Sequence, residues 1–170
     1  MKRFVIVFSN EPEDAPPWVA RACEAARLRY VDNEPITTEL SKDPEAQKLL
    51  LQSNLPPGEN PALAPAYQKA LDKVAGTQPR LGVYSLSWLL YLGQADGCVL
   101  DFTSLEAQRK QGLASGMKPQ DVEAYVSKFS QQLRERALKH VPQERLLVLP
   151  AGEPDARKVE LASAFINQLR

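Results

Sequence analysis

Residues 4–31 read FVIVFSNEPEDAPPWVARACEAARLRYV, and this stretch decides the fold. Its first five residues are aromatic or β-branched and apolar on both faces, which is typical of a central strand covered on both sides. A turn cluster and two prolines follow, and apolar side chains then recur at helical spacing. A second short strand is expected at residues 28–31. This order predicts two parallel strands joined by a crossover helix.

The same alternation of strands and helices continues beyond residue 31. Further strands are expected at 98–102 and 146–149, and further helices at 44–51, 65–75, 103–111, 119–140 and from Pro154 onward. Residues 81–92 suit either element, and we expect a short strand over 81–85 followed by a helix. Four prolines within 54–65 predict a surface loop. The chain is therefore predicted to form one α/β domain over residues 1–170. It has three layers and a mostly parallel sheet of four or five strands flanked by helices.

Composition excludes several classes of protein. The 21 basic and 21 acidic residues cancel, which argues against a general electrostatic grip on nucleic acid or an anionic membrane. Two cysteines without a CxxC pattern exclude a disulfide framework or a zinc ribbon, and one histidine excludes a multi-histidine metal site. No apolar run is long enough for a signal peptide or a membrane span. We expect a cytoplasmic protein with free thiols whose partner is a small molecule or another protein.

The motifs that hold nucleotides are missing from the sequence. A phosphate-binding loop needs glycines, a lysine and a hydroxyl after a strand, but the first strand is followed by residues 9–14, SNEPED, without a glycine. The dinucleotide pattern GxGxxG is absent as well. Residues 112–118, GLASGMK, contain glycines and a lysine but follow a predicted helix, and they indicate a hinge between two helices. No nucleotide cofactor is predicted.

Two stretches resemble known families. Residues 4–31 resemble the β-α-β start of thioredoxin-fold proteins such as glutaredoxins and glutathione transferases. Their CxxC pattern would fall on residues 15–18, APPW, where both thiols are missing. Residues 116–129, from Gly116-Met117-Lys118-Pro119 onward, are similar to a stretch late in small-molecule kinases with phosphate-binding loops. The first resemblance implies a fold without the redox chemistry, and the second carries over no catalytic residue.

Acidic side chains gather after the predicted strands. In a parallel sheet, ligands bind beyond the carboxyl ends of the strands. Seven carboxylates are expected at that edge: Glu11, Glu13, Asp14, Asp32, Glu34, Asp101 and Glu153. The loop residues at this edge include no lysine or arginine, so the edge suits a divalent cation, an amine or a basic partner surface, and repels phosphate. The predicted ligand-binding residues are Glu11, Asp32, Glu34, Ser104 and Glu153. The alternative is that these acids cap helix N-termini.

Asp101 is the best catalytic candidate in the sequence. It directly follows an apolar strand, so a rigid backbone should hold it at the sheet edge as a general base or a metal ligand. The alternative is a cap for the helix that follows it. His140 and Phe129 are expected on the buried face of the longest helix, with Phe129 facing the sheet. Cys23 and Cys98 are expected in the core.

Two functions remain open at this stage. The first is a small-molecule-binding or metal-binding protein, with or without enzyme activity, whose site surrounds Asp101, Asp32 and Glu11. The second is a non-catalytic interaction module with a degenerate α/β or thioredoxin-like fold. Its contact surface would combine the 54–65 loop with residues 11–59, which carry ten acids and five bases. Residues 107–145 carry eight bases and four acids, so the two halves have opposite charge.

Overall fold

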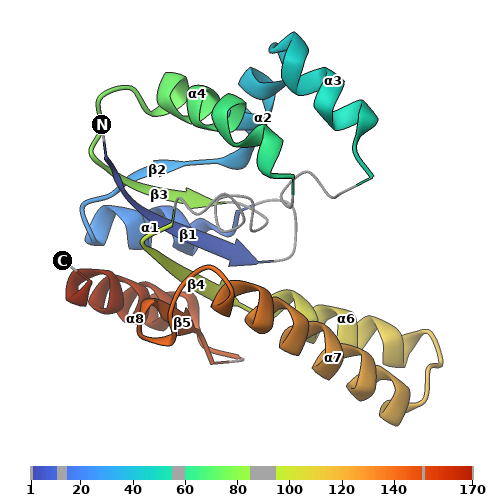
Figure 1. Cartoon of the computed structure of the whole chain (residues 1–170). Helices are drawn as coiled ribbons and strands as arrows, with labels where there is room; N and C mark the ends of the chain where they lie inside the picture. Colours follow the sequence, from blue (N-terminus) through green and yellow to red (C-terminus); the bar gives the residue numbers. More distant parts are fainter. Residues whose placement is uncertain (1, 11–14, 55–59, 85–94, 151, 170) are drawn as a thin grey trace.

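Five parallel strands form a single sheet in the order β2-β3-β1-β4-β5 (Figure 1). The structure is a computed structural model that describes residues 2–10, 15–54, 60–84, 95–150 and 152–169. The strands are β1 (Phe4–Asn10), β2 (Arg29–Val31), β3 (Arg80–Tyr84), β4 (Gly97–Asp101) and β5 (Leu146–Val148). This sheet and its helices confirm the predicted three-layer α/β fold.

The helices cover both faces of the sheet (Figure 1). Described in chain order, they are α1 (Pro17–Ala25), α2 (Asn33–Ser41), α3 (Pro44–Gln52), α4 (Ala64–Ala75), α6 (Thr103–Ala114), α7 (Pro119–Leu138) and α8 (Asp155–Gln168). Short 3₁₀ turns, η2 (Pro61–Leu63) and η3 (Gln143–Arg145), precede α4 and β5. Helices α1 and α8 cover one face, while α2 and α4 cover the other and α3 lies beyond them.

Strand β1 lies at the centre of the sheet because its side chains are apolar on both faces. Val5 and Val7 belong to the core beneath α2 and α4, while Ile6 and Phe8 belong to the core beneath α1 and α8. Alternation along a strand sends successive side chains to opposite faces. The two faces are therefore built from the same five-residue run that the sequence identifies as a central strand.

The strand register sets the composition of the carboxyl edge. Phe8 pairs with Tyr84 of β3 and Val99 of β4, and Asn10 pairs with Asp101. Because side chains alternate, Asp101 lies on the same face of the sheet as Val99, which is the face covered by α1 and α8. The register therefore places Asp101 beneath helices that come from opposite ends of the chain.

Helix α2 is an element that the sequence analysis missed. The sequence analysis places no helix between residues 31 and 44, but a helix begins there at Asn33. Asp32 is its N-cap and accepts a hydrogen bond from the Asn33 N–H at 2.6 Å. Ile36 and Leu40 are buried one turn apart against the sheet. An N-cap aspartate followed by a proline in the first turn is a start signal for a helix, and it outweighs the turn composition.

Helices α6 and α7 form a hairpin that extends from the body of the molecule (Figure 1). A third cluster of buried residues, Leu105, Val122 and Val126, holds the two helices together, with Phe129 packed against it. The prediction that Phe129 faces the sheet is therefore wrong, since it packs within the hairpin. The prediction that His140 is packed on an apolar face is also wrong, because His140 is exposed.

Some predictions concern segments that the structure does not describe. The centre of the 54–65 loop and the expected helix after residue 85 lie outside the described residues. Within the described ranges, helix α6 continues to Ala114 rather than ending at residue 111, and Gly116 follows with a φ of +87°. Among the helices of the described ranges, none combines the length and the apolar character needed to cross a membrane.

Candidate functional site

A buried ion pair lies at the carboxyl edge of the sheet. The ammonium of Lys158 donates a hydrogen bond to Oδ2 of Asp101 at 2.9 Å. The two side chains are 3% and 2% exposed. Asp101 ends β4, while Lys158 lies in the first turns of α8, so the two residues are 57 positions apart. The pair is almost fully removed from water. In such a buried environment an unpaired charge of either sign would be strongly unfavourable.

Trp18 lies beside this pair. It is the second residue of α1 and is 1% exposed, with its ring set edge-on to Phe8 at 6.0 Å between centroids. The Lys158 nitrogen is 5.7 Å from the centre of the indole ring, within the range of a cation–π contact. The indole N–H is buried and has no acceptor among the described residues. A buried donor without a partner is uncommon and marks a place where an acceptor would be stabilised.

The structure places Asp101 differently from both expectations. It does not cap the following helix, because the N-cap of α6 is Phe102, which makes no side-chain cap hydrogen bond. Its carboxylate is also not open to solvent, because it is buried and ion-paired with Lys158.

The other predicted site residues take separate positions. Asp32 caps α2. The pKa of the neighbouring Tyr30 phenol is raised, first by its burial and second by the charge of Asp32. Glu34 is exposed in the first turn of α2, Ser104 lies in the first turn of α6, and Glu153 is half-buried before α8. Glu11 lies outside the described residues. Within residues 2–10, 15–54, 60–84, 95–150 and 152–169, no three metal-ligating side chains gather in one place.

Lys158 is the member of this buried pair that the sequence analysis missed. The edge was expected to be free of basic groups because its loops contain none, but this lysine comes from a helix. A signal was present in the sequence. Lys158 precedes Ala162 by four residues and Ile166 by eight, so it lies on the buried stripe of α8. A lysine on an apolar helix face indicates a buried partner of opposite charge.

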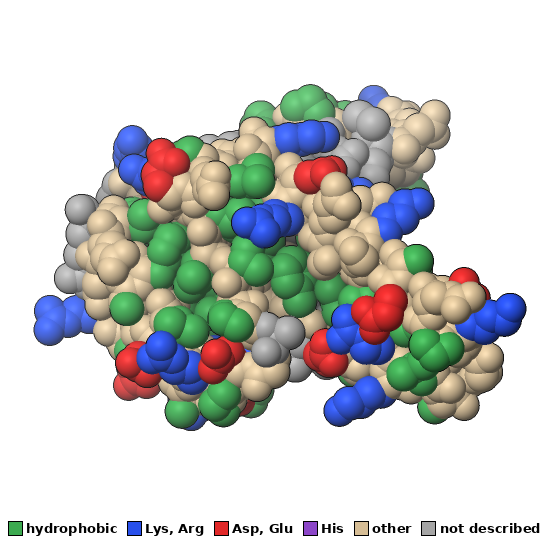
Figure 2. Space-filling model, turned by 90° about the horizontal axis from the view of Figure 1, so that it is seen from below, with side chains coloured by type: hydrophobic (Ala, Val, Ile, Leu, Met, Phe, Trp, Pro, Cys, Tyr) green, Lys and Arg blue, Asp and Glu red, His purple; other side chains and the backbone are tan. Residues whose placement is uncertain are grey.

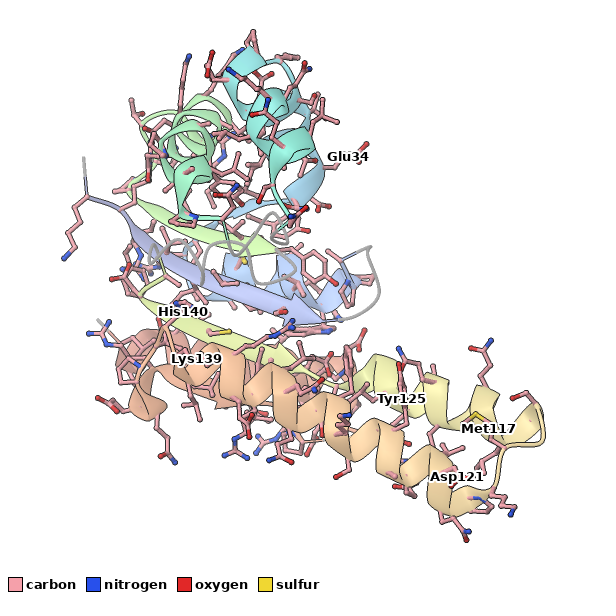
Figure 3. All side chains as sticks on the ribbon, turned by 45° about the vertical axis from the view of Figure 1, so that its right-hand side comes forward. Glu34, Met117, Asp121, Tyr125, Lys139 and His140 are labelled. Atoms are coloured by element: carbon pink, nitrogen blue, oxygen red, sulfur yellow. The ribbon has the colours of Figure 1, made fainter. Side chains whose placement is uncertain are left out.

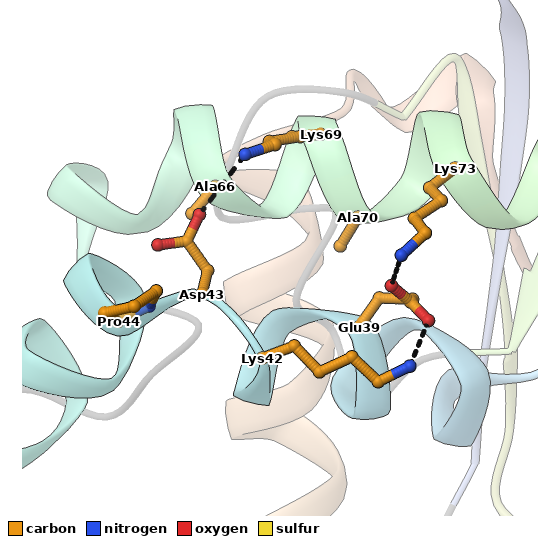
Figure 4. Close-up of a pocket in the computed structure, with 8 residues that line it drawn as sticks. All are labelled: Glu39, Lys42, Asp43, Pro44, Ala66, Lys69, Ala70 and Lys73. Atoms are coloured by element: carbon orange, nitrogen blue, oxygen red, sulfur yellow. Dashed lines mark hydrogen bonds and ion pairs between the residues drawn. The ribbon is translucent and has the colours of Figure 1, made fainter.

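A second recess lies between α2, the start of α3 and α4, on the opposite face of the sheet (Figure 4). It has a volume of about 270 Å³ and is lined by three lysines. Lys42 and Lys73 both donate to Glu39, and these hydrogen bonds lower the Glu39 pKa. Lys69 lies 3.8 Å from Asp43. The lysines of this recess therefore neutralise carboxylates of the acidic half of the chain.

Both thiols are buried and unreactive by position. Burial raises the pKa of Cys23 to about 12 and raises the pKa of Cys98 as well. Only the thiolate is a nucleophile, and a raised pKa keeps the thiol protonated at neutral pH. The expectation that the cysteines are core residues is confirmed.

Comparison with known proteins finds likeness among solved structures. No protein-family model matches the chain, and no curated protein matches it in sequence. Among solved structures, a gluconokinase from Sinorhizobium meliloti 1021 is similar, with a TM-score of 0.51 and 14% sequence identity. The match covers 99% of this chain and 93% of that chain. At this identity the likeness supports the α/β fold over the whole chain and does not assign a function.

Proposed function

We propose that the protein binds a small hydroxylated carboxylic acid at the carboxyl edge of its sheet, beside Trp18 and the Asp101–Lys158 pair. The observation that carries the proposal is the buried ion pair itself. Replacing such a pair by apolar residues of similar volume is often neutral or stabilising, so stability alone is a weak reason for its presence. Its position at the strand ends is where α/β proteins bind their ligands.

The donors at this edge call for a ligand that carries oxygen acceptors. The buried indole N–H of Trp18 has no acceptor among the described residues. Helix α1 begins beside Trp18 without a side-chain cap. Pro17 has no N–H and the Val19 N–H donates to the Pro16 carbonyl at 3.0 Å, so the helix N-terminus adds mainly the positive end of its dipole, which favours an anion. A carboxylate or a row of hydroxyl groups would satisfy these donors.

Gluconate is the natural first probe, because the solved structure of similar fold is named as a gluconokinase. The proposal is one of binding and does not extend to phosphoryl transfer. Residues 9–14, the end of β1 and the four residues after it in the sequence, contain neither glycine nor lysine, so they do not match the pattern of a phosphate-binding loop. A divalent cation is the less supported ligand, because Asp101 is already neutralised by Lys158.

The test uses the fluorescence of Trp18. The chain has two tryptophans, and Trp88→Phe leaves Trp18 as the only one. This variant is titrated with sodium gluconate and, separately, with sodium phosphate and magnesium chloride. We expect a saturable change in Trp18 emission with gluconate, because the bound acid accepts the indole hydrogen bond. Phosphate should change the emission less and magnesium should leave it unchanged.

Two further variants locate the response. The pair Asp101→Asn and Lys158→Met, combined in the Trp88→Phe background, should abolish it while retaining the fold. Lys73→Met, which alters the recess on the other face, should leave it unchanged. An unchanged emission with gluconate in the tens of millimolar would overturn the proposal. So would a response that is equal in the ion-pair variant.

A further inference from the structure

Strand β5 forms one edge of the sheet and is apolar along its whole length. Its residues are Leu146, Leu147 and Val148, and in the described part of the chain β4 is the strand that pairs with it. All three side chains are half-buried, whereas every residue of β4 is buried. The helices on the two faces of the sheet therefore leave this edge partly open to water.

The backbone of β5 has hydrogen-bonding groups that point away from the sheet. The Leu149 N–H donates to the Leu100 carbonyl of β4 at 2.9 Å. Because the backbone groups of successive strand residues point to opposite sides, the N–H and C=O of Val148 face outward, as does the C=O of Leu146. Within the residues that the structure describes, these three groups make no hydrogen bond to another segment. A strand edge with free groups of this kind is a template for pairing with another strand.

The other edge of the sheet is protected in a way that β5 is not. Strand β2 carries Arg29, which is exposed and donates to the carbonyls of Val74 and Ala75 at 3.2 and 3.0 Å. A charged side chain on an edge strand opposes pairing with another chain. Residues 146–149 contain no charged residue and no proline. The sheet is therefore open to extension at β5 and closed to it at β2.

An apolar patch continues from this edge onto the end of α7. Leu146 and Val148 pack against the same core as Ala137, and the next residue of α7, Leu138, is 41% exposed. Figure 3 shows the residue after it, Lys139, at the base of the α6–α7 hairpin, close to the sheet. Figure 2 views the molecule from the side of β5, and apolar side chains gather there. Leu138, Leu146 and Val148 are called the edge patch below.

The charges around the edge patch have both signs. Glu135 and Lys139 are exposed near the end of α7, and Glu144 is exposed in η3, directly before β5. Figure 2 shows further acids and bases interspersed among the apolar side chains of this face. A rim of mixed sign can be complementary to a copy of itself, and the chain as a whole has no net charge that would repel a copy.

We propose that two copies of the chain pair through β5 about a two-fold axis, so that their two five-stranded sheets become one continuous sheet. The two strands run antiparallel with Leu147 at the axis, and the Val148 N–H of each copy donates to the Leu146 carbonyl of the other. This register places both edge patches on the same face of the joined sheet, where they cover each other. Because the strands exchange only two hydrogen bonds, apolar contact supplies most of the affinity. The β2 edge is closed, so the assembly ends at two chains.

The mass of the protein in solution tests this pairing. Sedimentation equilibrium of the wild-type protein in the micromolar range should give twice the mass of one chain. Leu138→Lys and Leu146→Lys should each raise the dissociation constant of the dimer at least tenfold, because they place an ammonium in the edge patch. Leu138→Lys changes an exposed side chain, so this variant should fold with the circular dichroism of the wild type. Leu51→Lys is the matched control on α3, where the leucine is 87% exposed, and it should leave the dissociation constant unchanged.

Three results of this experiment would overturn the proposal. The first is a wild-type protein that has the mass of one chain at several hundred micromolar. The second is an assembly that grows beyond two chains as the concentration rises. The third is a dissociation constant that is equal in Leu138→Lys and Leu51→Lys.

Amide hydrogen exchange, followed by nuclear magnetic resonance, locates the contact between the two chains. In the wild-type dimer the amides of Val148 and Leu149 should both be protected. In the Leu138→Lys monomer the Val148 amide should exchange at least tenfold faster, while Leu149 stays protected because it donates to Leu100 of its own chain. A dimer whose Val148 amide exchanges as fast as in the monomer would show that the chains meet elsewhere, which also contradicts the proposal.

Discussion

At Asp101, a partner that comes from the far end of the chain decides what the carboxylate can do. The sequence indicates a residue with either catalytic or capping chemistry, since both need a carboxylate directly after a strand. In the structure the carboxylate of Asp101 accepts a hydrogen bond from Lys158, which lies 57 residues later in the chain. Local patterns describe the neighbours of a residue within a turn or two, so they could not identify this contact.

The ion pair makes a stability prediction that differs from both sequence-based expectations. Asp101→Asn should lower the free energy of unfolding by about 3–5 kcal/mol, because it removes the carboxylate charge that lies 2.9 Å from the buried ammonium of Lys158. Combining it with Lys158→Met should recover much of the loss, because the double variant no longer buries this ammonium. Urea unfolding of the four proteins of this cycle measures both effects. A neutral Asp101→Asn variant would contradict the structure.

Gly82 is the residue where β3 approaches α1 most tightly. A Cβ at this position would lie 2.2 Å from the sulfur of Cys23 and 3.2 Å from the ring of Phe8. Gly82→Ala should therefore cost about 1–3 kcal/mol, the usual range for overpacking a core. In the background of Cys23→Ala the same change should cost less, since the sulfur is gone. Urea unfolding measures the loss of unfolding free energy in both backgrounds. An equal loss would show that the close approach to the Cys23 sulfur is not what destabilises the Gly82→Ala variant.

The buried thiol of Cys23 predicts a loss of stability in alkali. Its pKa is raised to about 12 in the folded protein, whereas an exposed thiol ionises near 8.5. The unfolded chain therefore loses this proton first, so the contribution is complete below about pH 8.5 and declines as the pH rises toward 12. Cys23→Ala should reduce the loss of stability between pH 8 and pH 10 relative to wild type. Identical pH profiles from urea unfolding would refute this.

At the scale of single elements, the sequence predicts the strands and most of the helices well. Strand β1 follows from its run of aromatic and β-branched residues, and the structure confirms it. Helices α4 and α8 follow from hydrophobic periodicity with a proline at the start, and the structure confirms them as well. Helix α2 was missed because Asp32 belongs equally to a turn and to an N-cap. The burial of Ile36 and Leu40 against the sheet favours the helix over the turn. This burial is a tertiary effect that local sequence does not show.

The sequence predicts the helical periodicity of the apolar side chains of α7 correctly, but it does not predict what these side chains contact. Phe129 lies on the apolar stripe of the helix, as expected, yet it packs on the hairpin cluster and is half-buried. Phe129→Ala should therefore cost less than the about 3–5 kcal/mol typical of a fully buried phenylalanine. Hydrogen exchange should accelerate in α6 and the outer part of α7, while β1 stays protected. Faster exchange throughout the sheet would mean that this side chain belongs to the main core.

At the scale of the whole molecule, strand order and surface charge lie beyond local patterns. Nothing in residues 80–84 marks them as the neighbour of both β1 and β2. The charge asymmetry of the sequence is real, but folding brings lysines of α4 against Glu39 and Asp43. On the face that carries α7 and α8, Figure 2 shows basic and acidic side chains interspersed among apolar ones. On the predicted acidic contact surface, which belongs to residues 11–59, the lysines of α4 neutralise two of the acids, Glu39 and Asp43.

The molecule divides into a body with two shared cores and a hairpin with a core of its own. Replacing residues 108–125 by a short glycine–serine turn removes the outer hairpin but keeps Leu105, Val126 and Phe129 in place. Because the excised residues contribute nothing to the cores on either face of the sheet, the body should still unfold cooperatively, within a few degrees of the wild-type melting temperature.

Deleting residues 154–170 should have the opposite effect. This truncation removes Ala162 and Ile166 from the core beneath α1, and it leaves Asp101 buried without Lys158. The loss of packing and the loss of the Lys158 charge beside Asp101 act together, so the truncated chain should lose its cooperative melt and its near-ultraviolet circular dichroism. If the hairpin deletion abolished the melt as well, α6 and α7 would be part of the folding unit. Substitutions in the contact between the two helices would then also change the stability of the whole domain.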